Sequence, residues 1–154
     1  WTILRPGTFA SNLLAWSHAI RFTGGVRGPY PTSAQAPIHE VDVAAAAAAA
    51  LTQPGHAGRI YPMTGPQALT RVEQLQTIAD AIGRPLTFTE QTPEEFAAEM
   101  AQYGVRADIV TMLLRYWSDT VTKPDVPRPP DALIGRSART LAEWARDHAA
   151  EFGG

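Results

Sequence analysis

Hydrophobic residues alternate or cluster in short stretches bounded by proline, glycine and polar residues, and this pattern predicts strands. The predicted strands cover residues 1–4, 37–41, 58–63 and 86–90. The first of them, Trp1–Leu4, feeds directly into a Pro-Gly loop. Because a strand needs neighbours to satisfy its backbone N–H and C=O groups, we expect this opening strand to belong to a larger sheet. The rest of that sheet would precede residue 1.

Apolar residues at helical spacing, together with capping residues, predict helices between and after these strands. The predicted helices cover residues 11–22, 43–51, 70–82, 93–103, 109–116 and 140–152. Asp42 is the expected N-cap of the alanine-rich second helix, and Thr70 and Thr140 each begin a capping-box sequence. Residues 23–29 indicate a hairpin or connecting loop, and the prolines of 119–133 indicate a non-helical connector. This order of elements is typical of the second half of an α/β fold followed by a helical cap.

Composition narrows the class of protein. The chain has 154 residues, of which 45% are hydrophobic and 18% charged, as expected for an ordinary globular domain. A net charge of −2 gives no basic surface for nucleic acid, and no apolar run approaches the roughly 20 residues of a membrane span. The absence of cysteine excludes disulfides and thiolate metal sites and is compatible with a cytoplasmic enzyme.

The segment after the first strand is the best candidate for a ligand site, because ligands bind beyond the carboxyl ends of strands in open α/β sheets. We interpret Arg5–Asn12 as one wall of such a site. The competing interpretation makes Pro6–Phe9 an ordinary strand-to-helix turn and Asn12 the N-cap of the helix that follows. The glycines at 23–29 lack the G-x-G-x-x-G spacing, which disfavours a phosphate-binding loop there.

Other side chains could contribute to a substrate pocket. His39 is a candidate polar group near it, and Met100, Tyr103 and Tyr116 could line an apolar pocket, although core packing is the commoner use of such residues. A metal site at His39 and Glu40 is disfavoured because neighbouring strand residues point to opposite faces.

Several segments in series resemble the C-terminal half of NmrA-like proteins, which are atypical short-chain dehydrogenases/reductases. The segments that carry this resemblance are Thr2–Gly7, Pro37–Ala44, Tyr61–Thr70 with Ile82–Pro85, and Gly135–Trp144. The resemblance implies the C-terminal part of a Rossmann-like α/β fold with few strands, mostly helices, and a helical substrate lobe at about residues 86–135. The N-terminal dinucleotide-binding half would then be missing from this sequence.

The resemblance also implies NADP or NAD as cofactor, with Pro6, Gly7, Thr8, Phe9 and, less directly, Asn12 at its nicotinamide end. No tyrosine is followed by lysine four residues later, so a Tyr-x-x-x-Lys catalytic pair, if the parent has one, lies upstream.

Two functional hypotheses follow from the resemblance. In the first, the chain is part of an NAD(P)H-dependent oxidoreductase that transfers hydride to a small carbonyl or quinone-like acceptor. In the second, it belongs to a non-catalytic NAD(P)-sensing protein. A third interpretation is a fragment with a structural role, and in every case we expect the exposed strand edge to pair with the missing half or with a second copy of this chain.

Overall fold

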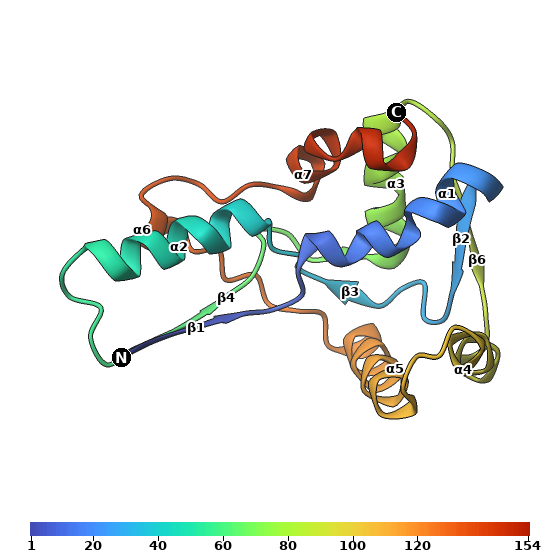
Figure 1. The fold of residues 1–154 in the computed structure, drawn as a ribbon, viewed down its shortest axis with the longest axis horizontal. Helices are drawn as coiled ribbons and strands as arrows, with labels where there is room; N and C mark the ends of the chain where they lie inside the picture. Colours follow the sequence, from blue (N-terminus) through green and yellow to red (C-terminus); the bar gives the residue numbers. More distant parts are fainter.

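The computed structural model of the protein describes residues 1–154 as short two-stranded sheets surrounded by helices (Figure 1). The strands are β1 (Thr2–Pro6), β2 (Gly25–Gly28), β3 (Ala34–Gln35), β4 (Arg59–Met63), β5 (Leu69–Thr70) and β6 (Thr87–Glu90). The α-helices are α1 (Ser17–Thr23), α2 (Glu40–Thr52), α3 (Arg71–Ile82), α4 (Pro93–Gln102), α5 (Ala107–Thr122), α6 (Asp131–Ile134) and α7 (Leu141–Asp147), and the 3-10 helices are η1 (Ala10–Trp16) and η2 (Ala149–Phe152).

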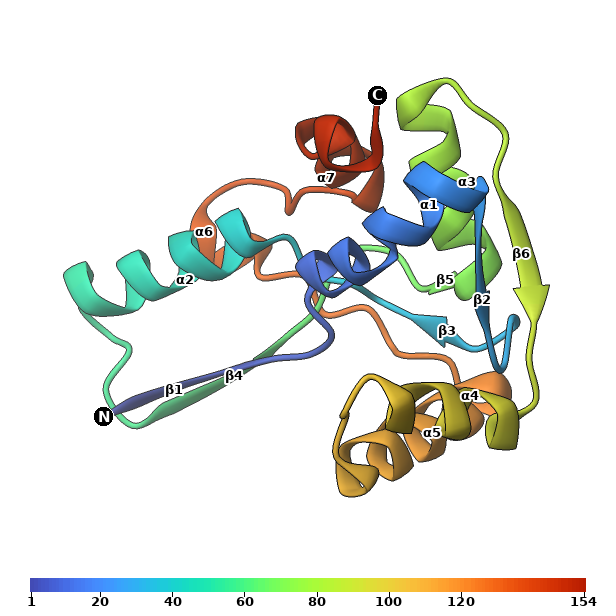
Figure 2. The same cartoon turned by 45° about the vertical axis from the view of Figure 1, so that its right-hand side comes forward.

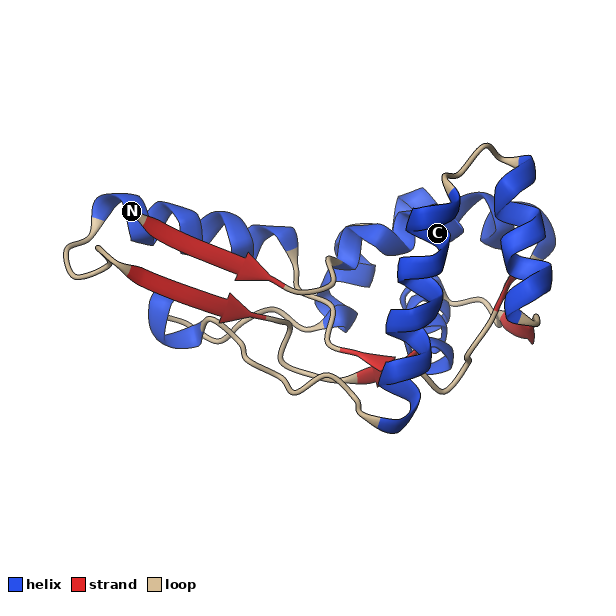
Figure 3. Ribbon diagram, turned by 90° about the horizontal axis from the view of Figure 1, so that it is seen from below, coloured by secondary structure: helices blue, strands red, loops and turns tan.

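The opening strand lies in a sheet, as the sequence predicts. β1 pairs in parallel with β4, from Thr2 opposite Arg59 to Pro6 opposite Met63. The alanine-rich helix α2 runs along this pair (Figures 1 and 3), and its Ala46 packs into a small apolar cluster with Met63. Small side chains allow this close approach of helix to strand. Both strands point their carboxyl ends toward the middle of the molecule.

The main core lies at the other end of the molecule, where α1, α3 and α7 pack together (Figure 2). The fully buried side chains there include Ile20, Ile78, Trp144 and Phe152. The capping boxes predicted at α3 and α7 are both present, with each threonine accepting from the backbone N–H three residues on. No helix is both long and apolar enough to cross a membrane.

The prediction for residues 23–29 is wrong, because this stretch contains β2, which pairs in parallel with β6. The pairing depends on a glycine: a Cβ added at Gly25 would lie 2.2 Å from the carbonyl oxygen of Thr87. The predicted strand 37–41 also shrinks to a single parallel bridge between Phe9 and Ile38. Glycine at a strand end lacks the side-chain alternation that identifies a strand from sequence.

Two predicted N-caps are wrong, namely Asp42 for α2 and Asn12 for the helix that follows β1. His39 caps α2, its Nδ1 accepting from the backbone N–H of Val41 at 3.2 Å. Asp42 is instead fully buried within the helix, and its carboxylate lies 2.7 Å from the Arg136 guanidinium. Asn12 does not cap η1, which begins at Ala10 and leaves Asn12 exposed in its middle.

The helices α4 and α5 pack against each other on the side opposite α7 (Figure 2). Phe96 of α4 meets Trp117 of α5 edge to face, with ring centroids 5.5 Å apart. Arg71 of α3 also packs against Trp117, with its guanidinium carbon 3.9 Å from the centre of a Trp117 ring. Arg71 is buried and forms no ion pair, and burial lowers its pKa to about 10.

Candidate ligand-binding cleft

A cleft of about 610 Å³ opens where β1 and β4 end. This is the edge of a parallel sheet at which ligands bind in open α/β folds. Three chain segments form its walls, namely the end of β1 and the loop after it, the end of β4, and α5 with the proline-rich segment that follows. The lining residues are Arg5, Gly7, Thr8, Pro62, Met63, Thr64, Tyr116, Pro124, Asp125, Val126 and Arg128.

The loop after β1 is fixed by backbone hydrogen bonds. The N–H of Gly7 donates to the carbonyl of Met63 at 2.8 Å, and the carbonyl of Thr8 accepts from the N–H of Ile38 at 2.8 Å. A Cβ at Gly7 would lie 3.2 Å from Cγ2 of Thr64, closer than side chains ordinarily approach. These contacts set the position of the Thr8 hydroxyl before any ligand arrives.

A chain of hydroxyl groups crosses the cleft from the β1 loop to the segment after α5. The Tyr116 hydroxyl donates to Oδ2 of Asp125 at 2.6 Å and lies 2.9 Å from Oγ1 of Thr8. Because the single phenolic hydrogen goes to Asp125, the Thr8 hydroxyl is the donor to Tyr116. The same Asp125 oxygen accepts from the backbone N–H of Ala36 at 3.2 Å. Thr8 therefore keeps its own oxygen lone pairs free as acceptors.

Tyr116 is held as a neutral phenol. Burial, followed by the hydrogen bond to Asp125 and the charge of that carboxylate, raises the pKa of Tyr116 well above its ordinary range, although the bond from Thr8 acts in the opposite direction. A phenol in this state is a poor proton donor to a substrate. Its role here is to hold α5 against the β1 loop.

The cleft carries an excess of positive charge. Arg5 and Arg128 both line it, and neither forms an ion pair. The only acidic lining residue is Asp125, whose carboxylate is already hydrogen-bonded. Two free guanidinium groups against one engaged carboxylate suit a ligand that carries negative charge or several acceptor oxygens.

The structure brings some of the predicted site residues together and separates others. Gly7 and Thr8 from the expected cofactor set meet Tyr116 from the expected substrate set in this cleft. Pro6 ends β1 and is half-buried, and Phe9 packs against the apolar cluster under α2. Neither of them lines the cleft, and nor does the exposed Asn12.

The remaining predicted residues also lie elsewhere. His39 is 2% exposed, and besides capping α2 its Nε2 lies 3.4 Å from the carboxylate of Asp147. Met100 is half-buried on α4, and Tyr103 is 74% exposed at the end of the same helix. None of the three side chains lines the cleft: His39 caps a helix, Met100 is partly packed on α4, and Tyr103 lies at the surface.

Among the charged residues of the cleft, sequence reasoning missed Asp125 and Arg128. Both lie in the segment that its prolines identified only as a connector. The sequence does contain a feature that could have identified them: these two charged residues lie between prolines, and a stretch so rich in proline is too rigid to be an ordinary flexible linker.

Comparison with known proteins relates the chain to a group of reductases. It is 39% identical over 153 residues to a (4-alkanoyl-5-oxo-2,5-dihydrofuran-3-yl)methyl phosphate reductase of Streptomyces griseus, and 36% identical over 163 residues to an NAD(P)H azoreductase of Xenophilus azovorans. Its fold matches the crystal structure of the NADPH-dependent quinone oxidoreductase 2 of Escherichia coli complexed with NADPH, with a TM-score of 0.78 and 26% identity. No protein-family model matches the sequence.

The lengths of these matches are informative. The alignment with each sequence relative includes 99% of this chain but only 54% of the relative. The alignment with the quinone oxidoreductase structure includes 93% of this chain and 51% of that protein. The chain thus spans about half the length of the proteins it matches. The predicted fold class, part of a Rossmann-type α/β fold rich in helices, is confirmed.

Proposed function

Because this chain is homologous to the C-terminal portion of NmrA-like NAD(P)H-dependent oxidoreductases, we propose that it belongs to a reductase of this kind and supplies one side of its active site. The observation that carries the proposal is the cleft at the ends of β1 and β4, where Thr8 and Tyr116 join two separate parts of the chain. The relatives include reductases named for NAD(P)H or NADPH, which supports either dinucleotide as the cofactor.

The residues of the cleft fit the nicotinamide end of such a cofactor. Thr8 offers free oxygen lone pairs at a fixed position, which suits the amide N–H groups of a carboxamide. Gly7 keeps the backbone close to Thr64, so no side chain occupies the floor of the cleft there. The cofactor, when bound, supplies hydride to an acceptor. The chain's own part is to orient both partners and to exclude water from between them.

The acceptor would be a small carbonyl or quinone-like compound. The relatives are named as reductases of a quinone, an azo compound and a furanone phosphate, which are conjugated acceptors of different polarity. Arg5 and Arg128 could bind oxygen atoms or an anionic group on such an acceptor. Tyr116 would contact the acceptor or the cofactor through its ring, since its hydroxyl hydrogen is committed to Asp125.

The test uses the protein as its gene encodes it, with whatever precedes Trp1. NADPH oxidation is followed with a panel of quinones, azo dyes and aldehydes, and NADPH binding is measured separately by calorimetry. Replacing Thr8→Val removes one hydrogen-bonding group, so we expect the KM for NADPH to rise about three- to tenfold. Thr111→Val, the same change on the exposed side of α5, is the matched control and should leave the KM unchanged.

The outcomes separate the two functional hypotheses. Turnover with any acceptor class supports the reductase. Tight binding of NADPH or NADH with no turnover across the panel would favour a sensor of the cofactor, and absence of binding of both dinucleotides would refute the proposal for both.

The open edge of β1 supports a further part of this proposal. β1 pairs only with β4, so its other edge is open, and parallel sheets normally have both faces covered. Trp1 and Ile3 are 74% and 40% exposed along it. We expect the 154-residue chain on its own to self-associate or to bind the other half of the protein. A monodisperse monomer that melts cooperatively in analytical ultracentrifugation and calorimetry would contradict this expectation.

A further inference from the structure

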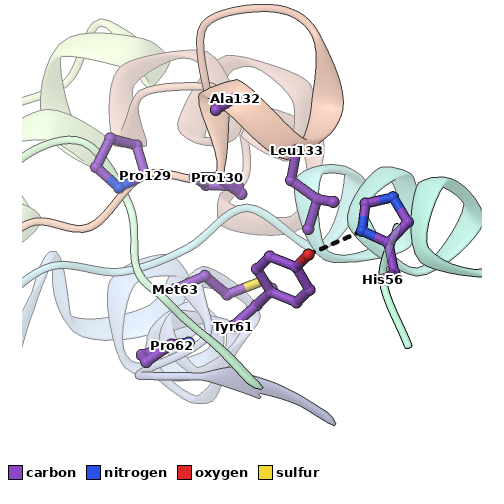
Figure 4. Close-up of a pocket in the computed structure, with 8 residues that line it drawn as sticks. All are labelled: His56, Tyr61, Pro62, Met63, Pro129, Pro130, Ala132 and Leu133. Atoms are coloured by element: carbon purple, nitrogen blue, oxygen red, sulfur yellow. Dashed lines mark hydrogen bonds between the residues drawn. The ribbon is translucent and has the colours of Figure 1, made fainter. Parts of the chain in front are cut away.

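A second cavity of about 350 Å³ adjoins the cleft on the side of α6 (Figure 4). Its walls are mainly apolar: Met63 and Pro62 come from β4, and Pro129, Pro130 and Leu133 come from α6 and the segment before it. This volume lies in the range of cavities that bind small molecules. The proposed function above makes no use of this cavity.

One polar pair stands in the apolar wall. Nδ1 of His56 and the hydroxyl of Tyr61 are 2.8 Å apart, and Figure 4 shows the Tyr61 hydroxyl turned toward His56 beside Leu133. Nε2 of His56 is buried and has no hydrogen-bond partner. An orphaned N–H is rarer in protein interiors than an orphaned acceptor, so the ring proton belongs on Nδ1, which donates to the Tyr61 oxygen. Tyr61 then keeps its own hydrogen to donate elsewhere.

The cavity adjoins the cleft, and the two spaces share part of their walls. Pro62 and Met63 line both spaces, and Arg128 of the cleft is followed directly by Pro129 of the cavity. The boundary is fixed by two hydrogen bonds: the N–H of Thr64 donates to the carbonyl of Arg128 at 2.9 Å, and the N–H of Arg128 donates to Oγ1 of Thr64 at 2.7 Å. A ligand bound in the charged cleft against Pro62 and Met63 would therefore lie next to the apolar cavity.

We propose that the His56–Tyr61 cavity is a subsite for an apolar tail of the acceptor, such as an alkyl or acyl chain, with Tyr61 donating a hydrogen bond to an ether or carbonyl oxygen on that tail. The acceptor would thus be amphiphilic, with its polar reducible head between Arg5 and Arg128 and its tail against Met63 and Leu133. This inference rests on the proposed function for the identity of the ligand. The cavity itself can be tested without any turnover.

The kinetic test uses 1,4-benzoquinones with linear alkyl substituents of increasing length and the protein as its gene encodes it. We expect kcat/KM to rise about three- to fourfold for each methylene until the cavity is full. Leu133→Trp fills the cavity and should abolish this dependence on chain length. Leu51→Trp adds the same bulk at an exposed site on α2 and should retain it. A flat response in the unmodified protein, or an unchanged slope in Leu133→Trp, would overturn the proposal.

The role of Tyr61 is tested by a milder change. Tyr61→Phe keeps the ring and removes only the hydroxyl, so kcat/KM should fall about three- to tenfold for quinones with an ether or carbonyl in the tail. Quinones with plain alkyl tails should show no such loss. An equal effect on both series would show that Tyr61 does not recognise the tail.

A binding test remains decisive if no acceptor is turned over. The chain has three methionines, and only Met63 lines the cavity, while Met100 and Met112 lie on α4 and α5. With ¹³C-methyl methionine in the protein as its gene encodes it, addition of 2-decanone should shift the Met63 resonance and leave those of Met100 and Met112 unmoved. No shift at Met63, or equal shifts at all three, would refute the subsite. Because Met63 also borders the cleft, the shift should be lost in Leu133→Trp. A Met63 shift that Leu133→Trp abolishes, without turnover, would retain the subsite and count against only the reductase proposal.

Discussion

Replacing Tyr116 with phenylalanine tests the hydroxyl chain that crosses the cleft. The change removes one bond to a carboxylate, at 2.6 Å, and one to a neutral hydroxyl, at 2.9 Å. A bond to a charged group contributes about 1.5–3 kcal/mol and a neutral one about 0.5–1.5 kcal/mol. Asp125 is only half-buried and keeps its bond from Ala36, so water can replace part of the loss. We therefore expect Tyr116→Phe to lower the free energy of unfolding by about 1–2 kcal/mol.

The prediction is best tested as a double-mutant cycle with Thr8→Val. Thr8→Val alone should cost about 0.5–1 kcal/mol, because it removes only the neutral bond. If the two hydroxyls interact as the structure shows, the double variant should cost less than the sum of the single ones by about 0.5–1 kcal/mol. Urea unfolding of all four proteins, with and without NADPH, measures the coupling. Additive free energies within about 0.3 kcal/mol would refute the argument that this chain joins α5 to the β1 loop.

Further predictions concern the fold around the cleft. Asp42→Ala should lower the free energy of unfolding by about 2–4 kcal/mol in urea titration, because it removes the buried carboxylate that holds the segment before α7. Gly25→Ala should lower the melting temperature measured by circular dichroism, because the new Cβ would clash with the Thr87 carbonyl and separate β2 from β6. The pKa of Glu143 is lowered by the backbone N–H and hydroxyl of Thr140, so its contribution to stability is present above pH 4.5 and is lost as the pH falls through the lowered value. Glu143→Gln should reduce the loss of stability between neutral pH and acid, as measured by urea unfolding across that range.

Local signals in the sequence predicted most helix boundaries. The capping boxes at Thr70 and Thr140 and the glycine at 83, which adopts φ = 64°, each act within a few residues of the chain. The interactions that fix these helix ends involve only neighbouring residues, so they can be predicted without knowledge of the tertiary structure. That β1 lies in a sheet could also be anticipated, since an isolated strand cannot satisfy its own backbone, but its pairing with β4 was not predicted.

Long-range contacts could not be predicted in the same way. Thr8 and Tyr116 are 108 residues apart, and nothing in either segment indicates that the hydroxyls meet. Asp42 looked like a helix cap because its partner, Arg136, lies in a distant segment whose path the sequence does not give. His39 is the cap because the helix starts three residues earlier than expected.

The way α5 is attached to the rest of the molecule bears on how the cleft works. Besides the Tyr116 hydroxyl, the side-chain contacts of α5 include the Thr120 hydroxyl with Ser33 at 2.7 Å and Gln35 at 3.2 Å, and Trp117 stacked on Arg71. These are polar and cation–π interactions, while Met112 on the same helix is 61% exposed.

Each such interaction contributes about 0.5–2 kcal/mol, so their sum of a few kcal/mol lies near or below the low end of the 5–15 kcal/mol that is typical of global unfolding. We therefore expect α4 and α5 to open locally while the core of α1, α3 and α7 stays folded. Amide hydrogen exchange should show α5 exchanging well before α3, and a ligand in the cleft should slow α5 selectively. Equal protection of the two helices would mean that α5 is part of the main cooperative unit. In that case, the cleft wall is fixed, and Tyr116→Phe should lower stability without a matching loss of ligand affinity. With local opening, by contrast, affinity should fall more than stability, because a ligand that binds only the closed cleft must first close the α4–α5 lobe without the help of that hydroxyl.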